Sequence, residues 1–216
     1  MFNIKFKGNY QDDSQLIKRK TIPKDATEFG IVDNLSKEFV RGFILILPLI
    51  VIMILLAYFK VKDIDYHLTM NLDIVISFFI VIISIYLLTF VHEIIHALFY
   101  PKNVEKQIWK DKKDGAYFVY CEEPISKSRF IIMCLAPMFI LGIIPFTIWL
   151  LLPKFLPMPY YLTLPIIFWF MTIMAMGDAA NIYHVVKEVP NKTKVFNYGF
   201  LRSFYINSRS MSLKKK

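Results

Sequence analysis

Cysteine is scarce in this chain of 216 residues, which contains two, Cys121 and Cys134. Their spacing does not match that of paired thiolate metal ligands, so a metal site built from cysteine is not expected. The membrane topology derived below places Cys121 in a cytoplasmic loop and Cys134 inside an apolar segment. We therefore expect two ordinary free thiols and no disulfide.

Charged side chains are almost absent from four long apolar runs, each long enough to cross a hydrocarbon core of about 30 Å. The chain is 56% hydrophobic, which is more apolar than a soluble domain of this length. We therefore predict an all-α membrane protein, a four-helix transmembrane bundle. Its spans are residues 42–59, 74–100, 130–152 and 162–186, with an N-terminal segment 1–41 and a basic tail 187–216.

The net charge of +9 is explained by topology rather than by nucleic-acid binding. With four spans, 23 of the 26 Lys and Arg residues fall on one side of the bilayer. The positive-inside rule then places both termini and the central loop 101–129 in the cytoplasm, where the basic residues contact anionic headgroups. Residues 1–40 lack an apolar core followed by a small-residue cleavage site, so we expect no cleaved leader and an uncleaved first span.

The second apolar run carries the motif His92-Glu93-Ile94-Ile95-His96. On a helix, this spacing puts both imidazoles on one face, where they can share a zinc ion, and the glutamate can act as general base on a zinc-bound water. Three ionisable groups inside a membrane segment are costly without such a partner. His92 lies eight residues before the end of the run, about 12 Å below the cytoplasmic boundary.

The fourth run has a second polar cluster, in which Asp178 is the one carboxylate. Asp178 also lies eight residues from the cytoplasmic end of its run, at the depth of His92, which makes it a candidate third zinc ligand. Asn181 follows on the same helical face and is a candidate for stabilising an oxyanion. A glutamate of the central loop, Glu122 or Glu123, is the alternative third ligand.

The central loop contains two segments that can pair as a short cytoplasmic β-hairpin, residues 104–109 and 116–121. The turn signal between them is Asp111-Lys-Lys-Asp114-Gly115, and the second segment is rich in strand-forming residues. An extended substrate peptide could add as a strand to the edge of residues 116–121.

Together these features resemble the putative zincin peptidase family, small bacterial integral-membrane proteins distantly similar to the site-2 proteases. The resemblance covers about residues 75–187 and rests on the His92–His96 motif, Pro101, the hairpin loop, Ala136-Pro137 and Gly177-Asp178. It implies a zinc metalloendopeptidase of the bacterial cell membrane, with His92, His96 and Asp178 as zinc ligands and Glu93 as base. The order Gly177-Asp178 differs from the Leu-Asp-Gly stretch of site-2 proteases.

The leading hypothesis is thus a zinc-dependent peptidase that hydrolyses membrane-associated proteins or peptides. The alternative is a non-catalytic membrane scaffold that binds and regulates another membrane protein. A transporter function is disfavoured, because the chain has no internal repeat and four spans with a single polar cluster offer few polar residues to line a substrate pathway.

Overall fold

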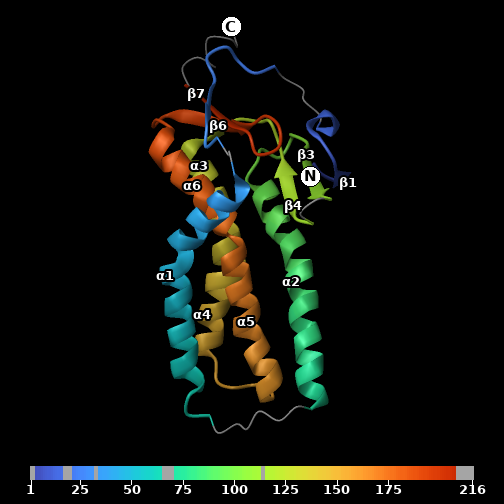
Figure 1. Ribbon diagram of the computed structural model, residues 1–216, viewed down its shortest axis with the longest axis vertical. Coiled ribbons are helices and arrows are strands. Elements are labelled where there is room, and N and C mark those ends of the chain that lie inside the picture. The colour runs from blue at the N-terminus through green and yellow to red at the C-terminus, as the bar shows by residue number, and fades with distance from the viewer. Residues whose placement is uncertain (1–2, 17–20, 32–33, 65–70, 113–114, 208–216) are drawn as a thin grey trace.

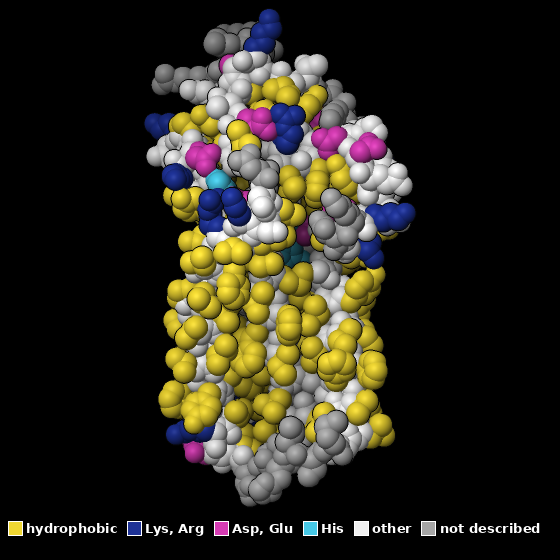
Figure 2. Space-filling model, in the orientation of Figure 1, with side chains coloured by type: hydrophobic (Ala, Val, Ile, Leu, Met, Phe, Trp, Pro, Cys, Tyr) yellow, Lys and Arg dark blue, Asp and Glu magenta, His cyan; other side chains and the backbone are white. Residues whose placement is uncertain are grey.

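The computed structural model describes residues 3–16, 21–31, 34–64, 71–112 and 115–207. Long helices form one part of the molecule, and the strands gather at one end of them (Figure 1). In the described part, four helical stretches are long and apolar enough to span a membrane. On the face shown in Figure 2, hydrophobic side chains cover most of the helices below the polar end.

The first two spans are single helices, α1 (Leu35–Val61) and α2 (Leu72–Leu98). Each begins at an asparagine, Asn34 or Asn71, whose side-chain oxygen accepts hydrogen bonds from the first free backbone N–H groups. Pro48 lies within α1, where a proline is tolerated in a membrane helix. The prediction of four apolar spanning helices is confirmed.

The third and fourth spans are interrupted. The third consists of α3 (Lys127–Pro137), the π-helical segment η2 (Met138–Ile143) and α4 (Ile144–Leu151), because Pro137 and Pro145 cannot donate backbone hydrogen bonds. The fourth consists of α5 (Met158–Met174) and α6 (Met176–Glu188), which meet at Ala175. This break starts a new helix just before Asp178.

The sequence predicted an all-α fold apart from one hairpin, but the fold is not purely all-α, because the described part contains two sheets with seven strands. One sheet has the order β1-β3-β4 and the other β2-β7-β6-β5. The strands are β1 (Ile4–Tyr10), β2 (Thr27–Phe29), β3 (Lys106–Asp111), β4 (Tyr117–Tyr120), β5 (Ile125–Ser126), β6 (Thr193–Asn197) and β7 (Ser203–Asn207); a short 3-10 turn, η1 (Asp13–Gln15), follows β1.

The predicted hairpin between the second and third spans is confirmed. Strands β3 and β4 pair antiparallel from Gln107↔Tyr120 to Lys110↔Tyr117. The other strands were missed because their partners are distant: β1 pairs in parallel with β3, and β2 pairs with β7. Strands β6 and β7 lie within the predicted tail, of which residues 208–216 are outside the described ranges.

Packing between helices sets the position of the polar end. Helix α6 packs against α1 and α3, while α2 packs against α5 and β4. A buried cluster that includes Phe29, Cys134, Val185 and Val195 joins α3 and α6 to the four-stranded sheet. As a result, the C-terminal half of α2 and the helix α6 lie at the end of the bundle where the strands gather (Figure 1).

Candidate metal centre

The last turns of α2 present His92 and His96 on one face of the helix, as the spacing predicts. Both residues are buried, with 5% and 8% of their surface exposed. Their ring centroids are 4.7 Å apart, and the two Nε2 atoms are 3.0 Å apart. Two imidazole nitrogens therefore point at one small volume beside the helix.

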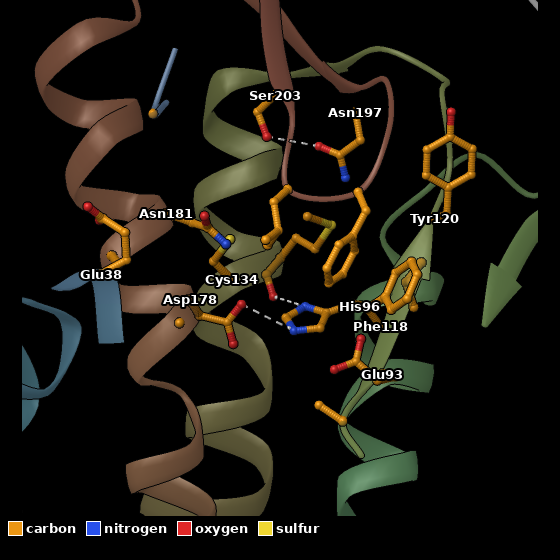
Figure 3. Close-up of a pocket in the computed structure, with 18 of the residues that line it drawn as sticks. Glu38, Glu93, His96, Phe118, Tyr120, Cys134, Asp178, Asn181, Asn197 and Ser203 are labelled. Atoms are coloured by element: carbon orange, nitrogen blue, oxygen red, sulfur yellow. Dashed lines mark hydrogen bonds and ion pairs between the residues drawn. The ribbon is translucent and has the colours of Figure 1, made fainter. Parts of the chain in front are cut away.

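Helix α6 supplies a carboxylate to the same volume. Asp178 lies in the first turn of α6, just after the break at Ala175. Its Oδ2 is 3.1 Å from His92 Nε2, and its Oδ1 is 3.3 Å from His96 Nε2. The three side chains form a group in which the potential ligand atoms all lie within 4.8 Å of one another. Figure 3 shows Asp178 and His96 facing each other from opposite helices.

The remaining nitrogen of His96 is held by the backbone of α3. His96 Nδ1 lies 3.1 Å from the carbonyl oxygen of Met133, to which it can donate a hydrogen bond. In the neutral ring this bond leaves the Nε2 lone pair directed at His92 and Asp178, as is typical of histidine metal ligands. The Nδ1 atom of His92 is buried without a hydrogen-bond partner among the described residues.

The donor set fits zinc. Two imidazole nitrogens and one carboxylate form a common set of protein ligands for a catalytic zinc ion, which keeps its fourth position for water or substrate. Lone pairs brought this close together repel unless they share a proton or a cation. The convergence of His92, His96 and Asp178 is therefore what a divalent-cation site requires.

Glu93 lies next to this group on α2 and faces the strand side of the cavity. Its carboxylate and Val119 of β4 line the same cavity. Figure 3 shows Glu93 beside His96 and Phe118, across the cavity from Asp178. This position lets the Glu93 carboxylate reach a molecule held between the two helices.

A cavity of about 480 Å³ surrounds the group. Asn181, the predicted oxyanion residue, lines this cavity one turn beyond Asp178 on α6. The alternative third ligands, Glu122 and Glu123, follow β4 and are not members of the metal-binding group found in the described part. Among the carboxylates considered from the sequence, Asp178 is the one that the fold brings to the two histidines.

Two walls of the cavity come from segments that the sequence did not connect with the site. The turn between β6 and β7 contributes Asn197, Phe200 and Ser203, and a hydrogen bond of 3.2 Å joins Ser203 to Asn197. The start of α1 contributes Glu38, whose Oε2 lies 2.8 Å from His184 Nε2 on α6. No local sequence pattern marks these residues, because each reaches the site through long-range packing.

The sequence model of one protein family, described as putative zincin peptidase, matches residues 85–194. This stretch is just over half of the chain and contains His92, Glu93, His96, the β3–β4 hairpin and Asp178. No curated protein and no solved structure matches the chain significantly.

Proposed function

The chain belongs to the putative zincin peptidase family, and from this premise we propose that it is a zinc-dependent membrane peptidase. It would hydrolyse peptide bonds of membrane-associated proteins or peptides. The observation that carries the proposal is the meeting of His92, His96 and Asp178 from two helices beside Glu93. A buried pair of histidines facing a carboxylate, with a second carboxylate lining the same cavity, is the arrangement of a hydrolytic metal site.

In this proposal, His92, His96 and Asp178 hold the zinc ion, and Glu93 is the general base. When bound, zinc supplies a Lewis acid that polarises the scissile carbonyl and lowers the pKa of water. Glu93 takes the proton of the attacking water and then gives it to the leaving amine. The amide of Asn181, on the opposite wall, donates a hydrogen bond to the developing negative charge on the carbonyl oxygen.

The substrate would bind in an extended form along β4. This strand lies at the end of its sheet, so one edge has no neighbouring strand in the described part. Residues 116–120 line the cavity, which places that edge beside the metal-binding group. A peptide added as a further strand would pass its carbonyl groups between Glu93 and Asp178.

We propose that the protein sits in the bacterial cell membrane with the sheet end in the cytoplasm. Both sheets lie at one end of the helices (Figure 1), and residues of β4 and of the β6–β7 turn line the cavity of the site. In the four-span topology, this end holds 23 of the 26 basic residues, which the positive-inside rule assigns to the cytoplasmic side. Anionic lipid headgroups would contact it there.

The zinc content of the purified protein tests the ligand assignment. We expect about one zinc per chain in the wild type and a large loss in Asp178→Ala, since removing one of three ligands opens the site. Glu122→Ala is the matched control and should keep its zinc. The reverse pattern would move the third ligand to the central loop, and no zinc in the wild type after repletion would favour the scaffold function.

The Glu93→Gln variant tests the base. It should bind zinc like the wild type and lose about 10²–10⁴-fold in peptide hydrolysis, the range for removal of a general base. The measurement is cleavage of an unstructured reporter protein in detergent, with zinc content determined on the same sample. Wild-type cleavage by zinc-loaded Glu93→Gln would contradict the assignment.

A further inference from the structure

The level of the site relative to the bilayer can be read from the charged side chains around it. On α1, Arg41 and Lys60 flank 18 residues without charge, most of whose large apolar side chains are exposed on the outer surface. At 1.5 Å per residue this stretch is about 27 Å long, close to the thickness of the hydrocarbon core. Arg41 and Lys60 therefore mark its two boundaries.

Contacts between α1 and α6 place the metal-binding group at the level of Arg41. Gly42 lies directly against the backbone of Met176, because a Cβ atom at Gly42 would be 1.7 Å from the Met176 carbonyl oxygen. The Phe39 ring is 3.4 Å from the position of a Cβ atom at Gly177. Asp178 follows immediately on α6, so the carboxylate of the site lies beside the charged end of the α1 span.

The β3–β4 hairpin marks the boundary on the α2 side. Lys110 Nζ lies 5.6 Å from the ring centres of both Tyr86 and Tyr117, and the two tyrosine hydroxyls are 3.3 Å apart. Tyr86 precedes His92 by six residues, about 9 Å along the helix. A lysine ammonium group stays at the membrane interface, so Lys110 Nζ places the side chains of Tyr86 and Tyr117 in the interfacial region. His92 follows Tyr86 towards the cytoplasmic end of α2, so it lies no deeper than this interface.

Both sides agree that the metal-binding group is level with the headgroups or just above the hydrocarbon. In Figure 2, recessed histidine and acidic side chains lie at the upper edge of the hydrophobic band. The apolar run 74–100, taken alone, predicts that His92 lies deeper in the membrane, because this run includes the last turns of α2. Helix α2 also packs against β3, β4 and α3, so the apolar residues of its last turns do not by themselves mark the membrane.

From this level, and resting on the proposed peptidase function, we infer the substrate class. The substrate is the juxtamembrane segment of a membrane-anchored protein, the first residues of its chain outside the hydrocarbon. Such a segment can extend along β4 while its backbone groups stay hydrated. A bond in the middle of a transmembrane helix would have to be lifted to this level and its helix unwound, which leaves backbone groups unpaired in lipid.

Spin labels test the level of the site without any activity measurement. Single cysteines replace Phe79, Val40 and Val91, which are exposed on the helix surfaces, and the two native thiols are buried, so the wild type is the labelling blank. The measurement is the collision rate of each label with oxygen, which concentrates in hydrocarbon, and with a water-soluble nickel complex. In liposomes we expect the Phe79→Cys label to collide mainly with oxygen. The labels of Val40→Cys and Val91→Cys should collide mainly with the nickel complex. An oxygen-favouring label at Val91→Cys, as at Phe79→Cys, would overturn the inference.

Two reporter substrates in zinc-loaded proteoliposomes test the substrate class. Both reporters consist of the same transmembrane helix followed by the same folded domain on the cytoplasmic side. In the first reporter a flexible segment joins the helix to the domain, and in the second the domain follows the helix directly. We expect cleavage inside the flexible segment, at least about ten-fold faster than any cleavage of the second reporter, which corresponds to about 1.4 kcal/mol in activation free energy. Mass spectrometry locates the cut.

The outcomes separate this inference from the function on which it rests. Equal rates for the two reporters, or a cut in the middle of the helix, with both lost in Glu93→Gln, would keep the peptidase and overturn the juxtamembrane substrate. No Glu93-dependent cleavage of either reporter would overturn the peptidase together with its substrate class. The spin labels would still report where the metal-binding group lies.

Discussion

The imidazole of His96 is held through both of its nitrogens. Nδ1 lies at hydrogen-bond distance from the Met133 carbonyl of α3, and Nε2 faces His92 and Asp178. A ring held in this way keeps one orientation and one tautomer, which a metal ligand requires. The spacing of the motif predicts that His92 and His96 share a face, whereas the carbonyl that orients one of them belongs to a distant helix.

Asp178 shows what residue-level prediction can and cannot reach. In the sequence, Asp178 and His92 each lie eight residues from the cytoplasmic end of an apolar run. This match predicts only that the two residues lie at the same depth in the membrane. The meeting of the three side chains also depends on the rotation of α6, which the break at Ala175 sets. Glu38 and Asn197 line the same cavity and left no signal in the sequence, since nothing near them in the chain reports their partners.

The thiol of Cys121 gives a prediction at the residue scale. Burial raises its pKa to about 11, because the thiolate is poorly solvated where the side chain is 2% exposed. Against an ordinary pKa two units lower, about 100-fold less thiolate is present at neutral pH. Iodoacetamide should therefore label Cys121 at least about 100-fold more slowly in the folded protein than after unfolding.

The pH dependence has a defined sign. The labelling rate of folded Cys121 should rise with pH up to about 11, whereas an exposed cysteine levels off near its ordinary, lower pKa. Ser128→Cys, at an exposed position of α3, is the matched control. Peptide mass spectrometry measures both, and equal rates for Cys121 and the control would contradict the predicted burial.

At the scale of elements, the contact between α1 and α6 depends on a single glycine. Gly42 brings the two backbones together at Met176, where a side chain on α1 would collide with the carbonyl group of α6. Close approach of this kind is typical of small residues in membrane helices. Since Asp178 lies two residues beyond Met176, this contact also supports the position of the proposed zinc ligand.

Gly42→Ala should therefore weaken both the fold and the metal site. The added methyl group meets backbone, which cannot swing aside, so we expect a loss of about 1–3 kcal/mol in stability, the usual cost of overpacking. Zinc content should fall as α6 moves away. Ile44→Ala, at a position that is 61% exposed, is the control. Unfolding midpoint and zinc content unchanged from the control would show that the helices adjust freely.

At the scale of the whole molecule, the two ends of the chain meet in one sheet. Strand β2 from the N-terminal segment pairs with β7, and β6 pairs with β5, which precedes α3. The sheet covers the polar end of the helices, and the β6–β7 turn reaches the cavity. Residues 187–216, which their charge predicts to be a basic tail, thus contribute two strands to the folded structure.

Removing this segment should prevent folding of the polar end. A chain ending at Asn191 loses Val195, Phe196, Phe204 and Ile206, all of which are at most 5% exposed. At about 1.5–3 kcal/mol per buried apolar side chain, the loss of about 6–12 kcal/mol is comparable with the whole stability of a domain. A chain ending at Asn207 keeps every described strand and is the control. Size-exclusion chromatography and thermal unfolding would compare them, and a monodisperse, normally stable shorter chain would refute the prediction.

The sequence by itself determined the four apolar helices, the two histidines on one face of a helix, the β3–β4 hairpin and the family. Each of these depends on residues close together in the chain, where periodicity, spacing and turn chemistry act locally. Only the tertiary structure decided that Asp178 meets His92 and His96, that β1 pairs with β3, and that the β6–β7 turn covers the cavity. These depend on contacts between segments far apart in the chain, whose energies come from packing and are not encoded in any one stretch.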